Sequence, residues 1–199
     1  FKGMGGTFNY TMVDGLWGIG PGKTRMQLAS AQVTNQKAGG QPEVVMDLQG
    51  IASDSTITAE AKTLSLNTQM QGTGRIGPLT FDSLGYEQNM QRLDVEVLRS
   101  FQQMVLANYK AGGLNQALSP SPEQATELLA KNAPLLLQAL PAYQVKFKAT
   151  YQGNAGELEY GVSVLKAPTA EQLAGNGWMP ALIQGSAINA SGTTANASL

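Results

Sequence analysis

The chain has 199 residues, 42% of them hydrophobic and 14% charged, with 13 Lys and Arg, 14 Asp and Glu, and neither Cys nor His. This length suffices for one domain with a sizeable core. The missing residue types exclude disulfides, thiol nucleophiles, zinc sites built on Cys or His, and a Ser-His-Asp triad. A net charge of −1 removes the usual electrostatic case for nucleic-acid binding. We therefore expect no catalytic residues, no metal, no cofactor and no nucleic-acid partner.

Residues 1–92 are expected to form a β-meander. Apolar side chains alternate there with Thr, Gln, Ser and Asn, which is typical of half-buried strands. The alternation predicts five strands, at about 8–12, 25–33, 44–51, 64–70 and 79–90.

The pattern changes to a helical one in residues 93–141. From Asp94 the apolar residues follow the i, i+3, i+4, i+7 spacing of an amphipathic helix that extends to Lys110 and ends at Gly112-Gly113. Asp94 is expected to be its N-cap. We expect this helix to pack its apolar stripe on one face of the sheet through Val97, Phe101, Met104 and Val105.

A second helix is expected to begin at Ser121. The run Ser121-Pro122-Glu123-Gln124 has the pattern of a capping box with proline at the first helical position. Pro134 is expected to end or kink this helix.

Residues 142–199 are expected to form a hairpin and a final strand. We predict that the hairpin pairs Tyr151 with Gly156, which places Lys148 opposite Glu159 on the solvated face. Residues 181–190 read as the last strand. A short helix capped by Thr169 is expected before it.

Two glycine-rich runs resemble nucleotide-binding loops but lack the required context. In 18–24, the first glycine of a phosphate-binding loop would fall on Trp17, and strand alternation follows instead of a helix. In 72–77 the letters match G-x-G-x-x-G, but Pro78-Leu79-Thr80 after them favours a strand. We interpret the first as a strand connection and the second as a turn.

Carboxylates offer the remaining route to catalysis. Neighbouring pairs occur at Asp47 and Asp54, Asp82 and Glu87, and Glu157 and Glu159. A glycosidase needs two such groups about 5–9.5 Å apart across a cleft. Solvated strand faces explain these residues more simply, so a carboxylate-dependent hydrolase of envelope polymers is only an alternative.

The eight methionines suggest an adaptable apolar groove. Packing beneath a twisted sheet is the simpler explanation of the same residues. The candidate groove or packing face consists of Met70, Phe81, Phe101, Met104, Tyr143, Phe147 and Tyr160.

The stretch 79–164 resembles the YdgA/YihF-type bacterial envelope proteins, a group of unknown function. The resemblance lies in the order of its pieces: Gly77-Pro78-Leu79, Gln91-Arg92-Leu93-Asp94-Val95-Glu96-Val97-Leu98, Glu127-Leu128-Leu129-Ala130-Lys131-Asn132-Ala133-Pro134, and Thr150-Tyr151-Gln152-Gly153-Asn154. It implies a longer Gram-negative precursor, anchored to the inner membrane by a segment absent from this chain, with its bulk in the periplasm. The chain, which begins at Phe1, would then be a fragment of that precursor.

Together these patterns predict a single α+β domain: a large, twisted antiparallel sheet of about seven to ten strands, with two main helices inserted before a C-terminal hairpin. The expected function is non-enzymatic. The protein would bind or scaffold through its curved sheet, with a lipid or an envelope protein as partner. One alternative is a structural module that self-associates as a homo-oligomer. The other is the hydrolase described above.

Overall fold

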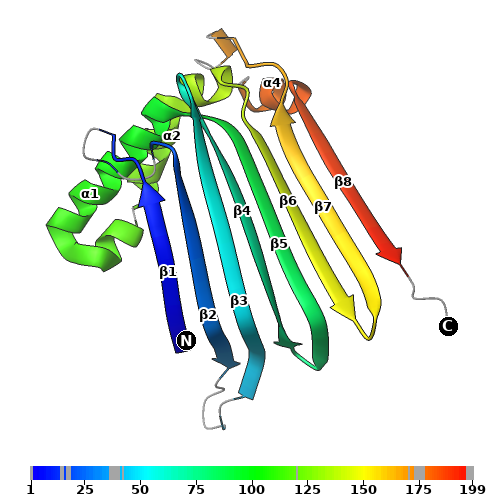
Figure 1. Ribbon diagram of the computed structural model, residues 1–199. Helices are drawn as coiled ribbons and strands as arrows, with labels where there is room; N and C mark the ends of the chain where they lie inside the picture. The colour runs from blue at the N-terminus through cyan, green and yellow to red at the C-terminus, as the bar shows by residue number, and fades with distance from the viewer. Residues whose placement is uncertain are drawn as a thin grey trace.

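Eight strands form one antiparallel sheet in the computed structural model, and each strand pairs with its neighbours in sequence (Figure 1). The structure describes residues 2–13, 16, 19–35, 41, 43–119, 121–169, 171–172 and 178–195. The strands are β1 (Lys2–Tyr10), β2 (Gly22–Asn35), β3 (Glu43–Glu60), β4 (Thr63–Ile76), β5 (Leu79–Asp94), β6 (Ala142–Tyr151), β7 (Asn154–Val164) and β8 (Ser186–Ala195).

Two helices, α1 (Val95–Leu118) and α2 (Pro122–Gln138), lie between β5 and β6 and project from one end of the sheet (Figure 1). The expected caps are confirmed. The carboxylate of Asp94 accepts hydrogen bonds from the N–H groups of Glu96 and Val97, and Ser121 forms a capping box with Gln124. No helix among the described residues is long and apolar enough to cross a membrane.

The predicted α+β class is wrong, because the protein is mainly β. Strands account for more than half of the described residues. The helices contact the strands chiefly at β5 and do not form a layer across the sheet. The predicted packing of the α1 stripe on a sheet face is also not observed: Phe101, in that stripe, remains 49% exposed. Alternation in the strands predicts the sheet, whereas helix amphipathicity does not identify the surface that a helix covers.

The predicted break of the first helix at Gly112-Gly113 is confirmed, whereas the second helix does not end at Pro134. Gly112 and Gly113 have non-helical backbone angles, yet helical structure resumes after them and continues to Leu118. Pro134 lies inside α2, which extends to Gln138. A proline lacks one backbone donor, but a helix can continue past it when the remaining hydrogen bonds are kept.

The β6–β7 hairpin is confirmed, but the predicted register is wrong by two residues. Tyr151 pairs with Asn154, so Lys148 lies opposite Glu157, and Lys146 lies opposite Glu159. The turn consists of Gln152 and Gly153, whose φ angles of +49° and +75° suit a two-residue hairpin. A shift of two residues keeps every side chain on its face, so alternation alone does not distinguish the two registers.

The predicted last strand is wrong in its first half. Residues Trp178–Gln184 form a short helix, α4, and β8 begins only at Ser186. The capping role of Thr169 is confirmed by its reciprocal hydrogen bonds with Gln172, although residues 173–177 lie outside the described part of the chain. A short apolar run such as residues 181–185 fits a helix as well as a strand, so its pattern does not distinguish the two.

The best-buried cluster lies at the end of the sheet from which α1 departs. Leu16, Ile19 and Leu64 are each at most 8% exposed and pack against Val95 and Leu98 at the start of α1. This cluster anchors the helices to the strand ends. Most of the sheet therefore lies away from the helices.

Candidate functional site

One face of the sheet carries a broad area of apolar side chains, which a polar row of Thr24, Ser55, Thr68 and Gln88 interrupts. Residues directly opposite each other in paired strands share a face, so the strand registers assign each side chain to one side. We call this side the apolar face; it includes Met4, Phe8, Met26, Leu28, Ile51, Met70, Leu84, Tyr86, Tyr143, Val145, Phe147, Ala149, Leu158, Tyr160, Val162 and Ile188.

Much of the apolar face is open to solvent. Phe8 is 67% exposed, Leu158 53% and Ile188 75%. Isolated apolar residues on a surface are ordinary, but a contiguous face that crosses eight strands marks a site of interaction. The apolar face is therefore the candidate functional site of the molecule.

A hollow of about 240 Å³ lies on this face, across β3, β4, β5 and β6. It is found where the pairing shifts between Gln49 and Ala52 and between Gly72 and Gly74. Such bulges bend a strand and increase its twist, and so they deepen the surface locally. The apolar residues that line the hollow are Met46, Leu48, Ile51, Met70, Gly72, Ile76, Leu84, Tyr86, Phe147 and Ala149.

Glycines make this bulged region possible. Gly74 has a φ of +149°, and a Cβ there would lie 2.2 Å from the backbone oxygen of Asp47 on β3. The predicted turn over 72–77 is therefore wrong for its first half: Gly72 and Gly74 belong to β4, and Gly77, with a φ of +58°, lies in the turn. The glycine-rich run thus shapes the sheet and its turn.

A second hollow of about 280 Å³ continues across β6, β7 and β8. It shares Phe147 and Ala149 with the first hollow. Its floor follows a row of opposed small residues, Ala149, Gly156 and Thr194. The two hollows together form a shallow apolar trough perpendicular to the strands.

Aromatic rings border the trough. The centroid of the Phe147 ring lies 5.3 Å from that of Tyr86 and 6.3 Å from that of Tyr160. Val145, which lies opposite Tyr160 and two positions from Phe147 on β6, is 1% exposed. Burial, followed by the proximity of Tyr86, raises the pKa of Tyr143.

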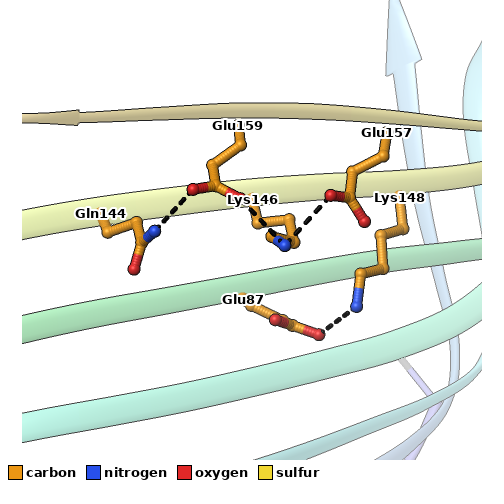
Figure 2. Close-up of polar contacts among 6 residues, drawn as sticks. All are labelled: Glu87, Gln144, Lys146, Lys148, Glu157 and Glu159. Atoms are coloured by element: carbon orange, nitrogen blue, oxygen red, sulfur yellow. Dashed lines mark hydrogen bonds and ion pairs between the residues drawn. The ribbon is translucent and has the colours of Figure 1, made fainter. Parts of the chain in front are cut away.

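The opposite face, which we call the polar face, has paired charges (Figure 2). Lys146 Nζ lies 3.0 Å from Glu157 Oε1 and 2.9 Å from Glu159 Oε2, and Lys148 Nζ lies 2.6 Å from Glu87 Oε1. Gln144 donates a hydrogen bond to Glu159. Hydrogen bonds from Lys146 and then from Gln144 lower the pKa of Glu159, and the two carboxylates raise the pKa of Lys146.

The remaining candidate carboxylates also have structural partners. Asp54 accepts from Arg25, and Asp47 accepts from Gln32. Asp82 accepts from the backbone N–H of Gly153, at the β6–β7 turn. The described residues contain no group of three or more acidic side chains placed to hold a metal ion. These contacts give the hydrolase alternative no support at the residues proposed for it.

The structure brings together four of the seven predicted groove residues. Met70 and Phe147 line the first hollow, and Tyr143 and Tyr160 lie beside it on the apolar face. The ring of Phe81 lies 5.9 Å from that of Tyr151. The other two predicted residues, Phe101 and Met104, belong to α1 and line neither hollow.

Several lining residues were missed in the sequence, among them Ile51, Leu84 and Tyr86. Leu84 and Tyr86 alternate within a predicted strand, which is the signal that could have found them. Ile51 lies just beyond Gly50, whose φ of +58° marks an irregularity that alternation does not reveal. Pairing across strands, and not spacing along one strand, assembles the trough.

These features define a class of protein: an open, mainly β sheet with one apolar face and one polar face of paired charges. The chain belongs to the DUF945 family, bacterial proteins of unknown function, whose family model matches residues 2–199. No curated protein and no solved structure matches the chain.

Proposed function

We propose that this protein is a non-enzymatic binding protein of the bacterial cell envelope, and that its apolar trough holds the acyl chain of a lipid. The observation that carries the proposal is the trough itself, which is lined by apolar side chains on a sheet face that the helices leave open. Each methylene removed from water in such a place contributes about 0.8 kcal/mol.

The size of the trough favours a chain segment over a compact ligand. Pockets that enclose a drug-sized molecule occupy about 300–1,000 Å³. Each hollow here is smaller, at about 240 and 280 Å³, and the two are continuous through Phe147 and Ala149. An extended hydrocarbon chain fits this shape, and its head group would remain in solvent.

The side chains that line the trough suit a ligand of variable shape. Met46 and Met70 are unbranched and polarizable, so they can adjust to chains of different length and unsaturation. Lys148 and Glu157 also border the trough, and their charges are paired on the polar face, Lys148 with Glu87 and Glu157 with Lys146. The trough thus recognises hydrocarbon without selecting a head-group charge.

Binding of a fluorescent fatty acid of sixteen to eighteen carbons to the delipidated full chain tests this proposal. In the variant Ala149→Trp, the indole occupies the floor shared by both hollows, and we expect the affinity to fall about tenfold or more because several methylenes lose their contacts. Ala155→Trp is the matched control, since Ala155 is exposed and lies on the polar face of the neighbouring strand.

Equal binding by Ala149→Trp and Ala155→Trp would contradict the proposed site. Absence of measurable binding by the unmodified chain would contradict acyl-chain binding altogether. Circular dichroism and urea unfolding of both variants separate loss of the site from loss of the fold.

The envelope location is part of the same proposal. The order of elements from Leu79 to Val164 supports the narrower YdgA/YihF-type assignment, which implies a periplasmic protein anchored to the inner membrane. Protease digestion of intact cells and of spheroplasts of the native host, followed by immunoblotting, tests the location. Digestion only after the outer membrane is opened supports a periplasmic site, whereas protection in spheroplasts would contradict it.

A further inference from the structure

A row of uncharged polar side chains crosses the apolar face beside the trough. Met70 and Tyr86, which line the first hollow, lie two residues away from this row on β4 and β5, a separation of about 7 Å along the strands. The row runs across the strands and is therefore parallel to the trough. We call it the polar row; its members, one opposite the next on β2 to β5, are Thr24, Ser55, Thr68 and Gln88.

The polar row has hydrogen atoms left over for a further acceptor. Ser55 Oγ and Thr68 Oγ1 lie 2.9 Å apart, and a bond between two hydroxyls uses only one of their two hydrogens. The OH of Tyr86 donates to Gln88 Oε1 at 3.0 Å, which leaves the amide nitrogen of Gln88 with both of its hydrogens. Tyr86 thus connects the wall of the trough to the polar row.

These donors restrict what can lie against the polar row. Ser55, Thr68 and Gln88 are partly buried in the chain by itself, and a ligand that covered them would remove their remaining contact with water. A buried donor without an acceptor costs free energy. Pure hydrocarbon supplies no acceptor, so the part of a ligand that covers the row needs an oxygen.

The charges of the same strand segments lie on the other face of the sheet. Arg25, Asp54 and Glu87 each come one position from a member of the polar row, so the alternation of side chains puts them on the polar face. There Arg25 is paired with Asp54. A carboxylate or phosphate against the polar row would lose its water while this cation remained on the opposite face. A neutral carbonyl group needs only hydrogen-bond donors and avoids that cost.

We propose that the polar row binds the ester carbonyl of a fatty acyl ester whose hydrocarbon chain lies in the trough, an inference that rests on the proposed function. The carbonyl oxygen accepts from the amide nitrogen of Gln88 and from the hydroxyl hydrogen that the Ser55–Thr68 pair leaves over. These donors belong to neighbouring strands, since Thr68 lies directly opposite Gln88. The trough then holds the hydrocarbon, and the polar row determines the class of lipid.

Two lipids that differ only in the carbonyl test this inference. In monolauroylglycerol an ester joins the chain to glycerol, and in 1-O-dodecylglycerol an ether does; both are uncharged and have equally long chains. Displacement of a fluorescent fatty acid from the delipidated full chain measures the affinity of each. We expect the ester to bind about fivefold more tightly, because one or two neutral hydrogen bonds depend on its carbonyl.

Two substitutions remove the donors and keep side chains of similar size. In Thr68→Val and in Gln88→Met, the preference for the ester should fall to about twofold or less, whereas the affinity for the ether should change by less than about twofold. Thr58→Val is the matched control, since Thr58 is exposed and lies on the polar face of β3. This control should keep the full preference for the ester.

Equal affinity of the unmodified chain for the ester and the ether would overturn this inference and leave the proposed acyl-chain site in place. A preference that both Thr68→Val and Gln88→Met retain would also overturn it, because the carbonyl would then be bound elsewhere. So would an equal loss of both lipids in both variants, because the polar row would then only shape the trough. Failure of the fatty acid and both glycerol lipids to bind the unmodified chain would overturn the proposed function and this inference with it. Circular dichroism of each variant establishes that the sheet is intact.

Discussion

At the scale of single residues, the polar face depends on Lys146. Its Nζ lies between the carboxylates of Glu157 and Glu159, which come from positions two apart on β7 and so point to the same side (Figure 2). Such exposed pairs contribute little individually to stability. A shared cation, however, links two carboxylates that would otherwise repel each other.

We predict that Lys146→Gln lowers the urea midpoint, most strongly near neutral pH. The pKa of Glu159 lies below its ordinary value of 4.5 in the fold, so its contribution is present above that pH and is lost as the pH falls further. The pKa of Lys146 lies above its ordinary value of 10.5, so its contribution is complete below that pH and is lost above it. Urea titrations at several pH values measure the difference from the unmodified chain.

The matched control is Lys23→Gln, since no ion pair of Lys23 is found in the described part of the molecule. The control should change the midpoint little at any pH. A Lys146→Gln deficit that stayed constant down to pH 3 would show that the ion pairs do not cause it.

At the scale of elements, the bulges of β3 and β4 decide the shape of the sheet. Alternation predicted five strands in the first ninety residues, and five are present; four extend beyond their predicted bounds, whereas the first, predicted at about 8–12, lies at Lys2–Tyr10. The predicted 44–51 strand, for example, extends through Gly50 to Glu60 as β3. A bulge interrupts the alternation without ending the strand. A prediction from alternation therefore places the end of the strand too early.

Replacement of Gly74 by alanine is expected to lower the free energy of unfolding by about 2–3 kcal/mol. The new Cβ would meet the backbone oxygen of Asp47, and the φ of +149° is one that other residues rarely adopt. Gly77→Asn is the control, because its φ of +58° suits asparagine and no atom lies within 4 Å of the added Cβ. Urea unfolding of both variants measures the difference; equal and small losses would mean that the bulge does not constrain the fold.

At the scale of the whole molecule, the sheet has an apolar face that the chain itself leaves exposed. Stability then comes from strand pairing, from the aromatic cluster around Val145 and from the cluster at Leu64, and not from a second layer.

We predict that Phe8→Thr combined with Leu158→Thr changes the free energy of unfolding by less than about 1 kcal/mol. Both side chains are more than half exposed, and threonine is a good strand former. The same variant should bind an environment-sensitive apolar dye more weakly, because it removes two apolar side chains from the open face. Unfolding and dye fluorescence are measured in parallel, and a large loss of stability with unchanged dye binding would mean that the face is covered in solution.

The amino-acid sequence was sufficient to predict the strands of the meander, the β6–β7 hairpin and the caps at Asp94 and Ser121. Each of these depends on neighbours within a few residues, where alternation and capping chemistry act. The sequence also placed Met70, Phe147 and Tyr160 in one candidate set. The mainly β class, the two-residue shift of the hairpin and the exclusion of Phe101 from the trough became evident only from the packed chain.

The trough could not be predicted from the sequence because the register between strands assembles it. Met70, Tyr86, Phe147 and Leu158 form one row because four strands align side by side, and a shift of two residues in any pairing would move the row while preserving every alternating pattern. The exposure of the apolar face to solvent also depends on the tertiary structure. Local chemistry specifies which side chains are apolar, but only the packing of the helices at the strand ends leaves that face without a cover.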